Sequence, residues 1–297
     1  MSNKPLCVID TSVVTHLLMD LTHGKDGKLK NPISNQERDD RIKIGQQAYS
    51  SLFWLIGEDI SNWDILWVGD SKECPLWRTV EVREWLDSLP SDAPQLTKRK
   101  GSRSGYKGNR QTSPSAQWAG KRAIKFADPV LFPGYEADDV MAGVVKSFPE
   151  REILLATVDS DWLQCVKDKD EHSEKVSWVC LKGFSPQYRD TKRGLEWFEN
   201  KISKESVKTK DTIDTSSLRN IVDWKMLVGD VSDNLPADTP RQFIDLFEPG
   251  EFHKLWLNDS FKSIISDKII PATTDDDAFM EWTNKYGEFK TKTCLIK

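Results

Sequence analysis

Three short apolar segments of this chain each lead to an aspartate, and this repeated pattern limits the fold more than any other feature. Residues 6–9 end at Asp10, residues 65–68 lead to Asp70, and residues 153–158 end at Asp159. Apolar runs of this length are typical of buried strands, and segments of helical periodicity lie between them. Strands that alternate with helices form a mostly parallel central sheet flanked by helices. We therefore predict an α/β fold.

The same pattern predicts where a functional site lies. Ligands of mostly parallel sheets bind beyond the carboxyl ends of the strands, and the three aspartates arrive at that edge. A single aspartate after a strand is usually a turn residue. Three of them, together with an acid-rich helix start elsewhere in the chain, favour a site.

Other elements follow from periodicity and from turn residues. A fourth apolar run, residues 176–180, has no acid at its end. We expect loops or connectors at 22–35 and 201–215, and helices at 36–60, 77–89, 137–145, 217–228, 240–247 and 276–286. In the helix at 77–89, Val80, Trp85, Leu86 and Leu89 are expected to share one face. The part after residue 200 is expected to be all helical.

The acid-rich helix start comprises Glu136, Asp138 and Asp139, directly before an apolar helical run. Acids in a first turn complement the positive end of the helix dipole, which explains them without any ligand. The alternative is a metal site. Glu136 and Asp139 are three residues apart and share a helix face, whereas Asp138 points about one residue's rotation away and would reach a different ion.

Carboxylates from several parts of the chain are therefore candidate ligands. The full set is Asp10, Asp70, Glu136, Asp138, Asp139, Asp159, Asp161, Asp230 and Asp233. Ionised carboxylates repel one another strongly unless protons or cations lie between them. Oxygen ligands favour hard ions, so we expect two Mg²⁺ ions, for which Mn²⁺ can substitute. Two such ions about 4 Å apart can activate a water and stabilise the leaving oxygen of a phosphodiester.

Charge is unevenly distributed along the chain. The net charge is −5, yet residues 93–127, here called the basic segment, contain nine Lys or Arg and no acid, which leaves −14 on the remainder. A solvated loop is one explanation of the basic segment. However, Tyr106 and Trp118 lie among its basic residues, and single-stranded nucleic acids bind where aromatic rings stack on bases and cations neutralise phosphates.

Cysteine, histidine and hydropathy exclude several classes. The five cysteines form no C-x-x-C pair and the four histidines are isolated, which argues against zinc sites, disulfide frameworks and histidine-based catalysis. No apolar stretch has membrane-spanning length and no secretory signal is recognised. We expect a monomer in the cytoplasm, or in the host cytoplasm if the protein is viral, and no membrane partner.

Six motifs resemble those of the structure-specific 5′ nucleases, a family of flap endonucleases and 5′–3′ exonucleases with a PIN-like fold. They are V-I-D at 8–10, V-G-D at 68–70, Y-K-G-N-R at 106–110, Y-E-A-D-D-V at 135–140, T-V-D-S-D-W at 157–162 and V-G-D-V-S-D-N-L-P at 228–236. They occur in the family's order. The sequence looks closest to the bacteriophage members and to the nuclease domain of bacterial DNA polymerase I.

The resemblance implies a role for each motif. It implies that Asp10, Asp70, Glu136 and Asp138 hold the first metal ion, that Asp159, Asp161, Asp230 and Asp233 hold the second, and that Asp139 supports both. Catalysis would rest on Asp10, Asp70 and Asp138 with Lys107, which would contact the scissile phosphate. Nucleic acid would be bound by a basic arch of about residues 90–125, through Lys98, Arg99, Lys100, Arg103, Tyr106, Lys107, Arg110, Lys121 and Arg122.

The resemblance also implies the division of the chain. Residues 1–200 would form the PIN-like catalytic domain, and residues 201–297 a helical DNA-binding region that contributes Asp230 and Asp233. Two departures stand out. Here 28 positions separate Arg78 from Tyr106, so the arch is enlarged. The glycine-rich hairpin that grips duplex DNA in the family, and can hold a monovalent cation, is replaced by A-D-T-P-R-Q at 237–242.

The predicted function is a Mg²⁺-dependent 5′ nuclease that hydrolyses DNA or an RNA–DNA hybrid near 5′ ends or forks, in replication, primer removal or repair. The resemblance implies products with a 5′-phosphate and a 3′-hydroxyl. A single-strand-binding protein at the fork is a candidate partner. One alternative is a PIN-type ribonuclease, which would need neither Asp230 and Asp233 nor the basic arch. The other is a replication-fork DNA-binding protein with a weak site, which would have no reason to keep all nine acids.

Overall fold

The structure is a computed structural model that describes residues 4–13, 62–71, 73–96, 106, 107, 121, 127–182 and 185–271. Its centre is a six-stranded sheet with the order β5-β4-β3-β1-β2-β6. The strands are β1 (Leu6–Asp10), β2 (Asp64–Val68), β3 (Ile153–Ala156), β4 (Val176–Lys182), β5 (Ser185–Arg189) and β6 (Ile270–Pro271). The four apolar runs thus form strands as predicted.

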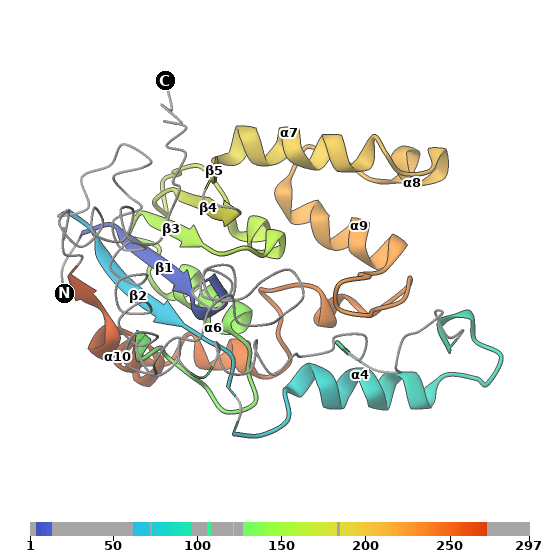
Figure 1. The fold of residues 1–297 in the computed structure, drawn as a ribbon, viewed down its shortest axis with the longest axis horizontal. Helices are drawn as coiled ribbons and strands as arrows, with labels where there is room; N and C mark the ends of the chain where they lie inside the picture. Colours follow the sequence, from blue (N-terminus) through green and yellow to red (C-terminus); the bar gives the residue numbers. More distant parts are fainter. Residues whose placement is uncertain are drawn as a thin grey trace, which may run out of the picture.

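The four central strands are parallel, and only the edge strands reverse direction. β1 pairs in parallel with β2 and β3, and β3 pairs in parallel with β4. β5 and β6 pair antiparallel with β4 and β2. The predicted class, a mostly parallel sheet flanked by helices, is therefore confirmed. In Figure 1 the arrows of β1, β2 and β3 point to the same side of the molecule.

Both faces of the central strands are buried, which explains why these strands are mostly apolar. Leu6 and Val8 of β1 belong to the main core, where they lie with side chains of α6 (Ala137–Ser147) and α10 (Asp259–Lys268). The alternate residues Cys7 and Ile9 are also buried. Gly143 allows the close approach of α6 to the C-terminal part, because a Cβ there would lie 2.4 Å from the Trp256 indole nitrogen.

The helix α4 (Trp77–Ser88) agrees with the prediction in extent, and the predicted face is right only in part, since Trp85 and Leu86 pack on a core cluster. Its buried residues are Trp77, Arg78 and Val82, whereas Val80 is exposed. The reason is that Arg78, a charged residue, is drawn inward by the carboxylates described below. Apolar periodicity cannot detect a buried cation. Figure 1 shows α4 extending away from the sheet.

The chain after β5 departs from the prediction in three places. The expected connector at 201–215 lies partly in α7 (Thr191–Ile202) and α8 (Val207–Thr212). The expected helix at 240–247 is only a short 3-10 turn, Arg241–Phe243, because the Asp245 side chain accepts from the Phe247 N–H in place of a helical carbonyl. The part after residue 200 is not all helical, since β6 pairs with β2.

The predicted helix at 217–228 is present in two pieces. A 3-10 turn, Leu218–Asn220, is capped by Ser217, whose side chain accepts a hydrogen bond from the Arg219 N–H, and α9 (Ile221–Val228) follows. Gly229 ends α9 with φ of 81°, and a Cβ there would lie 2.6 Å from the Leu235 carbonyl oxygen. A glycine is therefore required where the chain turns into the loop that carries Asp230 and Asp233.

Several predictions fall on residues outside those described: the loop at 22–35, the helices at 36–60 and 276–286, and Trp118. Among the helices that the structure describes, none has the length and apolar character needed to span a bilayer. The division at residue 200 stays a proposal. Core residues on both sides of it, from Leu6 to Ile265, belong to one buried cluster.

Candidate metal and nucleic-acid site

The acids that follow the parallel strands lie at the carboxyl edge of the sheet. Asp10 is the last residue of β1, Asp70 comes two residues after β2, and Asp159 comes three residues after β3. The Ala137 N–H, at the start of α6, donates to Asp70 Oδ1 at 3.0 Å. That bond brings the acid after β2 to the acid-rich helix. We call Asp10, Asp70, Glu136 and Asp138 the first group, and Asp159, Asp161, Asp230 and Asp233 the second group.

Asp10 is held by three donors. The Ser12 N–H donates to its Oδ1 at 2.8 Å, and the hydroxyls of Ser12 and Thr157 donate to its Oδ2. Burial and the negative charge of Asp70 nevertheless raise the pKa of Asp10 to about 6. Asp10 is therefore fixed in place while its ionised form is disfavoured. A cation nearby would stabilise that ionised form.

Glu136 is fully buried and lies against two cations. The Arg78 Nη1 lies 2.9 Å from its Oε2, and the Lys107 ammonium contacts its Oε1. Burial alone would raise the pKa of Glu136, but the charges of Lys107 and Arg78 outweigh burial and lower it to about 2. The Tyr106 hydroxyl lies 2.8 Å from Glu136 Oε2 and 3.0 Å from Asp233 Oδ2, so it joins the first group to the second.

Asp139 lies next to Glu136 of the first group and is held by three donors. Arg78 Nη2 lies 2.7 Å from its Oδ1, while the Trp77 indole and the Glu136 N–H donate to its Oδ2, each at 3.0 Å. Glu136 and Asp139 therefore do lie on the same side of the helix start, as their spacing predicted. Their shared partner is the Arg78 guanidinium, which neutralises part of their charge.

Asp138 contacts the turn that carries two acids of the second group. The Trp162 indole N–H donates to Asp138 Oδ1 at 2.5 Å. Burial and the charges of Asp159 and Glu136 raise the pKa of Asp138. Burial and the charge of Asp161 likewise raise the pKa of Asp159 to about 7, although Lys225 opposes this shift.

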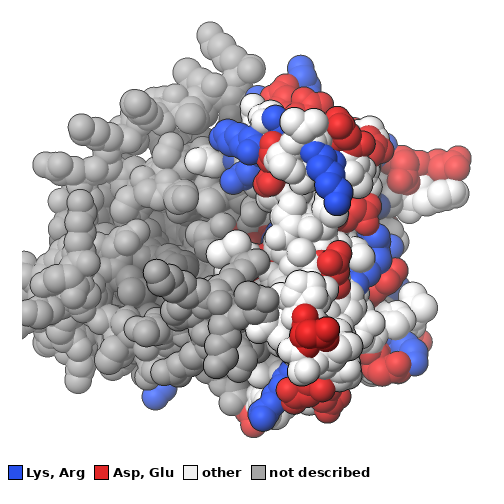
Figure 2. Space-filling view, turned by 90° about the vertical axis from the view of Figure 1, so that its right-hand side faces the viewer, with Lys and Arg blue, Asp and Glu red and all other residues white. Residues whose placement is uncertain are grey.

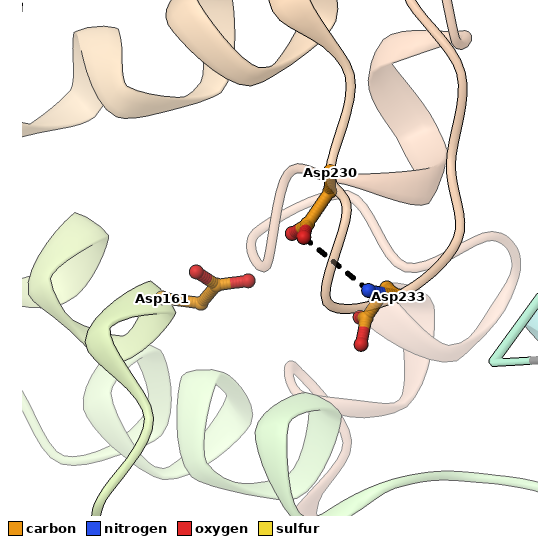
Figure 3. A group of neighbouring side chains, drawn as sticks. All are labelled: Asp161, Asp230 and Asp233. Atoms are coloured by element: carbon orange, nitrogen blue, oxygen red, sulfur yellow. Dashed lines mark hydrogen bonds between the residues drawn. The ribbon is translucent and has the colours of Figure 1, made fainter. Parts of the chain in front are cut away.

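The second group contains three carboxylates that converge closely. Asp161, Asp230 and Asp233 each offer an oxygen within 4.8 Å of the others (Figure 3). Asp161 comes from the 3-10 turn Ser160–Cys165, and the other two from the loop after α9. The Lys225 ammonium lies between them, 2.5 Å from Asp230 Oδ2 and in contact with Asp161 Oδ1.

The donor set fits hard divalent cations. Of the nine candidate acids, Asp161, Asp230 and Asp233 are the set of three whose oxygens converge within 4.8 Å in the described part of the chain. The basic side chains that contact the candidate acids there are Arg78, Lys107 and Lys225. Negative charge therefore remains in excess within a largely buried site. Carboxylate oxygens are the ligands that Mg²⁺ and Mn²⁺ prefer, and no cysteine or histidine accompanies them in these contacts.

Most of the predicted nucleic-acid-binding residues lie outside the described part. These are Lys98, Arg99, Lys100, Arg103, Arg110 and Arg122. Of the other three, Lys121 is exposed, Lys107 is half-buried, and Tyr106 is buried with 6% of its surface exposed. Figure 2 views the molecule from the side to which β1, β2 and β3 point, and acidic and basic side chains are mixed over its described surface.

The segment that replaces the glycine-rich hairpin is engaged in internal contacts. Arg241 forms ion pairs with Asp223 at 2.8 Å and with Asp245 at 3.0 Å. Asp245 is fully buried and also binds Arg219 at 2.6 Å. The Asp238 N–H donates to the Met226 carbonyl at 2.7 Å. Asp238 and Gln242 are exposed, so this surface offers an acid and an amide to solvent.

Sequence reasoning missed the residues that hold the acids in place. Lys225, Trp77, Trp162, Ser12 and Thr157 were not predicted as site residues, and Arg78 was singled out only as the residue that marks the start of the arch. Lys225 could have been found, because it is the one basic residue in an otherwise mostly apolar helix, Ile221–Val228, five positions before Asp230. No pattern in the sequence shows that an indole N–H meets a carboxylate far away in the chain.

Comparisons with known proteins agree with the motifs. No known family profile matches the chain. A DNA polymerase I of Caldicellulosiruptor bescii is 34% identical over 147 residues, which cover 47% of this chain and 15% of the polymerase. This chain therefore corresponds to a small part of the length of that relative.

Solved structures of bacteriophage T5 proteins show a more distant likeness. A complex of the T5 D15 flap endonuclease with DNA and metal ions is 15% identical, covers 95% of this chain and 92% of its own, and gives a TM-score of 0.46. The T5 5′-exonuclease with bound zinc is 16% identical, covers 95% and 97%, and gives a TM-score of 0.40. These structural likenesses are too distant to carry an argument. The sequence relative is a bacterial DNA polymerase I, one of the two kinds of protein to which the motifs of this chain look most similar.

Proposed function

We propose that this protein is a 5′ nuclease that hydrolyses phosphodiesters of DNA near a 5′ end, with two divalent cations, Mg²⁺ above all, bound by the first and second groups. The observation that carries the proposal is the meeting of acids from β1, β2, α6, the turn after β3 and the loop after α9 at one edge of the sheet. The Lys107 ammonium lies beside them, on Glu136. Such a site combines cation ligands with a positive side chain that can reach a phosphate.

Each part of the chain has a task in this proposal. Bound divalent ions would supply the polarisation of water and of the phosphodiester oxygens. Asp10, Asp70 and Asp138 would orient the first ion, and Asp161, Asp230 and Asp233 the second. Asp139 and Arg78 would hold Glu136 in place. Lys107 would place positive charge on the reacting phosphate, where it stabilises the developing negative charge.

The substrate class follows from the basic segment and from the relatives. The basic segment, with aromatic side chains among its cations, supports a nucleic acid as the substrate, and the polymerase relative supports DNA. An RNA–DNA hybrid is a second proposed substrate, and a role at replication forks, in primer removal or in repair, is the proposed setting. A fork protein such as a single-strand-binding protein is the proposed partner.

One cleavage experiment tests the proposal. A 5′-flap DNA, a blunt duplex, an RNA–DNA hybrid and a single-stranded RNA, each labelled, are incubated with the protein in Mg²⁺ or in EDTA. We expect cleavage of the flap or the duplex near the 5′ end in Mg²⁺, with a 5′-phosphate on the product, and none in EDTA. Cleavage of the single-stranded RNA alone would establish the ribonuclease instead. Tight fork binding without cleavage in Mg²⁺ or Mn²⁺ would contradict the enzyme.

A further inference from the structure

Trp162 connects the first group of acids to the second. The inference drawn from this contact rests on the proposed function, because it concerns the same site. Trp162 lies in the 3-10 turn Ser160–Cys165, directly after Asp161. Its side chain is fully buried, with 0% of its surface exposed. Its indole nitrogen lies 2.5 Å from Asp138 Oδ1, on the first turn of α6. One hydrogen bond thus joins the turn of the second group to an acid of the first group.

The environment of Asp138 makes this hydrogen bond consequential. Asp159 and Glu136 both face Asp138 with like charge. Repulsion from these neighbours favours rotation of the carboxylate away from them. An indole N–H is a donor only and does not titrate, so it fixes Oδ1 at every pH and leaves Oδ2 for a cation. Buried donors that orient ligands in this way influence metal affinity strongly.

The turn that carries Trp162 is itself fixed on other sides. The Asp159 side chain accepts a hydrogen bond from the Asp161 N–H at 2.9 Å. The Trp178 indole donates to the Asp159 carbonyl at 3.1 Å. The Gln164 amide donates to the Ile244 carbonyl and accepts from the Leu246 N–H, each at 3.2 Å. Because the turn cannot shift freely, the indole bond fixes Asp138 relative to Asp159 and Asp161.

We propose that Trp162 is a positioning residue that sets the spacing between the two ion-binding groups through its hydrogen bond to Asp138. It touches neither substrate nor ion. Its contribution is to hold the ligand of one ion at a set place relative to the ligands of the other. Loss of the N–H would loosen Asp138 and weaken the binding of divalent ions.

The test compares two tryptophans that each donate an indole hydrogen bond to a carboxylate. Trp162→Phe keeps a ring in the core and removes the donor to Asp138. Trp224→Phe is the matched control, because the Trp224 indole on α9 donates to Glu205 Oε1 at 3.3 Å, in the turn between α7 and α8, and Glu205 is not one of the nine candidate acids. Mn²⁺ binding is measured without DNA by electron paramagnetic resonance of the free ion. Single-turnover cleavage is measured as a function of Mg²⁺.

For Trp162→Phe we expect Mn²⁺ to bind more weakly, by roughly 10- to 100-fold, and half-maximal cleavage to need more Mg²⁺ by a similar factor. Saturating Mg²⁺ should restore much of the rate, which a general loss of folding would not permit. Trp224→Phe should match the wild type in both measurements. Equal Mn²⁺ affinity and equal Mg²⁺ dependence in the two variants would overturn the inference while leaving the proposed function standing.

A second measurement uses the unaltered protein, in case Trp162→Phe fails to fold. The Trp162 indole proton, followed by nuclear magnetic resonance, should exchange slowly with solvent and shift when Mg²⁺ is added, whereas the Trp224 indole proton should not shift. An unchanged Trp162 signal at saturating Mg²⁺ would overturn the inference. Failure of the wild type to bind Mn²⁺ and to cleave any of the four substrates would overturn the proposed function, and this inference with it.

Discussion

Lys225 Nζ lies 2.5 Å from Asp230 Oδ2, five residues further along the chain, and both side chains are buried. The same ammonium contacts Asp161, so one lysine neutralises part of the second group. Burial would lower the pKa of Lys225, but the charges of Asp161 and Asp230 outweigh burial and raise it. The two acids therefore favour the charged form of this lysine.

Lys225→Met should destabilise the metal-free protein, because two buried carboxylates lose their shared cation. Removing one partner of a buried ion pair costs roughly 3–5 kcal/mol. Divalent ions should restore part of this loss, so the increase in Tm on adding Mn²⁺ should be larger than in the wild type. Thermal unfolding in EDTA and in Mn²⁺ measures both effects. Lys254→Met removes an exposed pair with Glu251 and should change either Tm little.

Asp70→Ala or Asp161→Ala should abolish or severely reduce cleavage, since each removes a ligand of a different ion. DNA binding should stay intact or become tighter, because removal of a carboxylate lowers the repulsion between the protein and the phosphates. Rates are compared with affinities for the same flap substrate. The control is Asp168→Ala, which removes an exposed acid seven residues after Asp161 and should leave both unchanged. Near-wild-type rates in both ligand variants at saturating Mg²⁺ would rule out the two-ion assignment.

Lys107→Ala should lower the single-turnover rate more than it weakens binding, by about 10²- to 10³-fold if its charge meets the reacting phosphate. Substitution of Lys98, Arg99 or Lys100 should instead lower the affinity and reduce its salt dependence. Lys121→Ala, at an exposed lysine that is also predicted to bind nucleic acid, is the matched comparison, and it should lower affinity without lowering the single-turnover rate. A change in the Kd alone for Lys107→Ala would show that its proposed catalytic role is wrong.

The metal-free protein should lose stability as the pH rises from about 4 to about 7. Burial and neighbouring acids raise the pKa of Asp10 to about 6 and of Asp159 to about 7. Both exceed the value of about 3.9 for aspartate in an unfolded chain, so the folded state holds more protons in this window and stability falls as they leave. The lowered pKa of Glu136 acts in the opposite sense, but only at lower pH.

Thermal unfolding in EDTA across this pH range measures the effect. Asp10→Asn and Asp159→Asn should each flatten the dependence, because an amide does not titrate. Saturating Mg²⁺ should also flatten it, since the ion binds the ionised carboxylates. A Tm that rises with pH from about 4 to about 7 in EDTA would contradict the assignment of these two groups.

Arg241→Gln should lower stability and leave the salt dependence of DNA binding unchanged. The guanidinium is already paired with Asp223 and the buried Asp245, so it has little freedom to contact phosphate. The rate in potassium should equal the rate in sodium at equal ionic strength, and affinity should fall little as the duplex of a flap substrate is shortened. A potassium preference with steep loss on shortening would show that a duplex grip survives at this segment.

Much of the fold could be predicted because the pattern that marks a buried strand is contained within a few successive residues. The runs that become β1, β2, β3 and β4 are apolar at successive positions, and the acids after three of them mark the carboxyl edge. The antiparallel edge strands β5 and β6 were missed. β5 contains Pro186 and polar residues, and β6 has only two residues, so neither shows a strand pattern of its own.

Sequence reasoning located acids at the carboxyl edge of the sheet, but it did not locate the residues that hold them in place. The candidate acids lie in short motifs, and several acids close together in a sequence are easy to recognise as possible cation ligands. Arg78, by contrast, lies 58 residues before Glu136 and 165 before Phe243, whose carbonyl its Nε also contacts at 3.3 Å. Such contacts depend on how α4 packs against the rest of the molecule, and no local pattern encodes that packing.

The contacts of α4 with the rest of the molecule determine where the length of this chain can change. Its contacts with the acids are made by Trp77 and Arg78 in the first turn, and Trp85 still packs on Phe243, with ring centroids 6.0 Å apart. The last residues of the helix, Asp87 and Ser88, are exposed. Insertions or deletions between Ser88 and Tyr106 thus leave these contacts of α4 in place. In the proposed function this segment meets the nucleic acid, so the size of the strand end that is admitted could change while the acids keep their places.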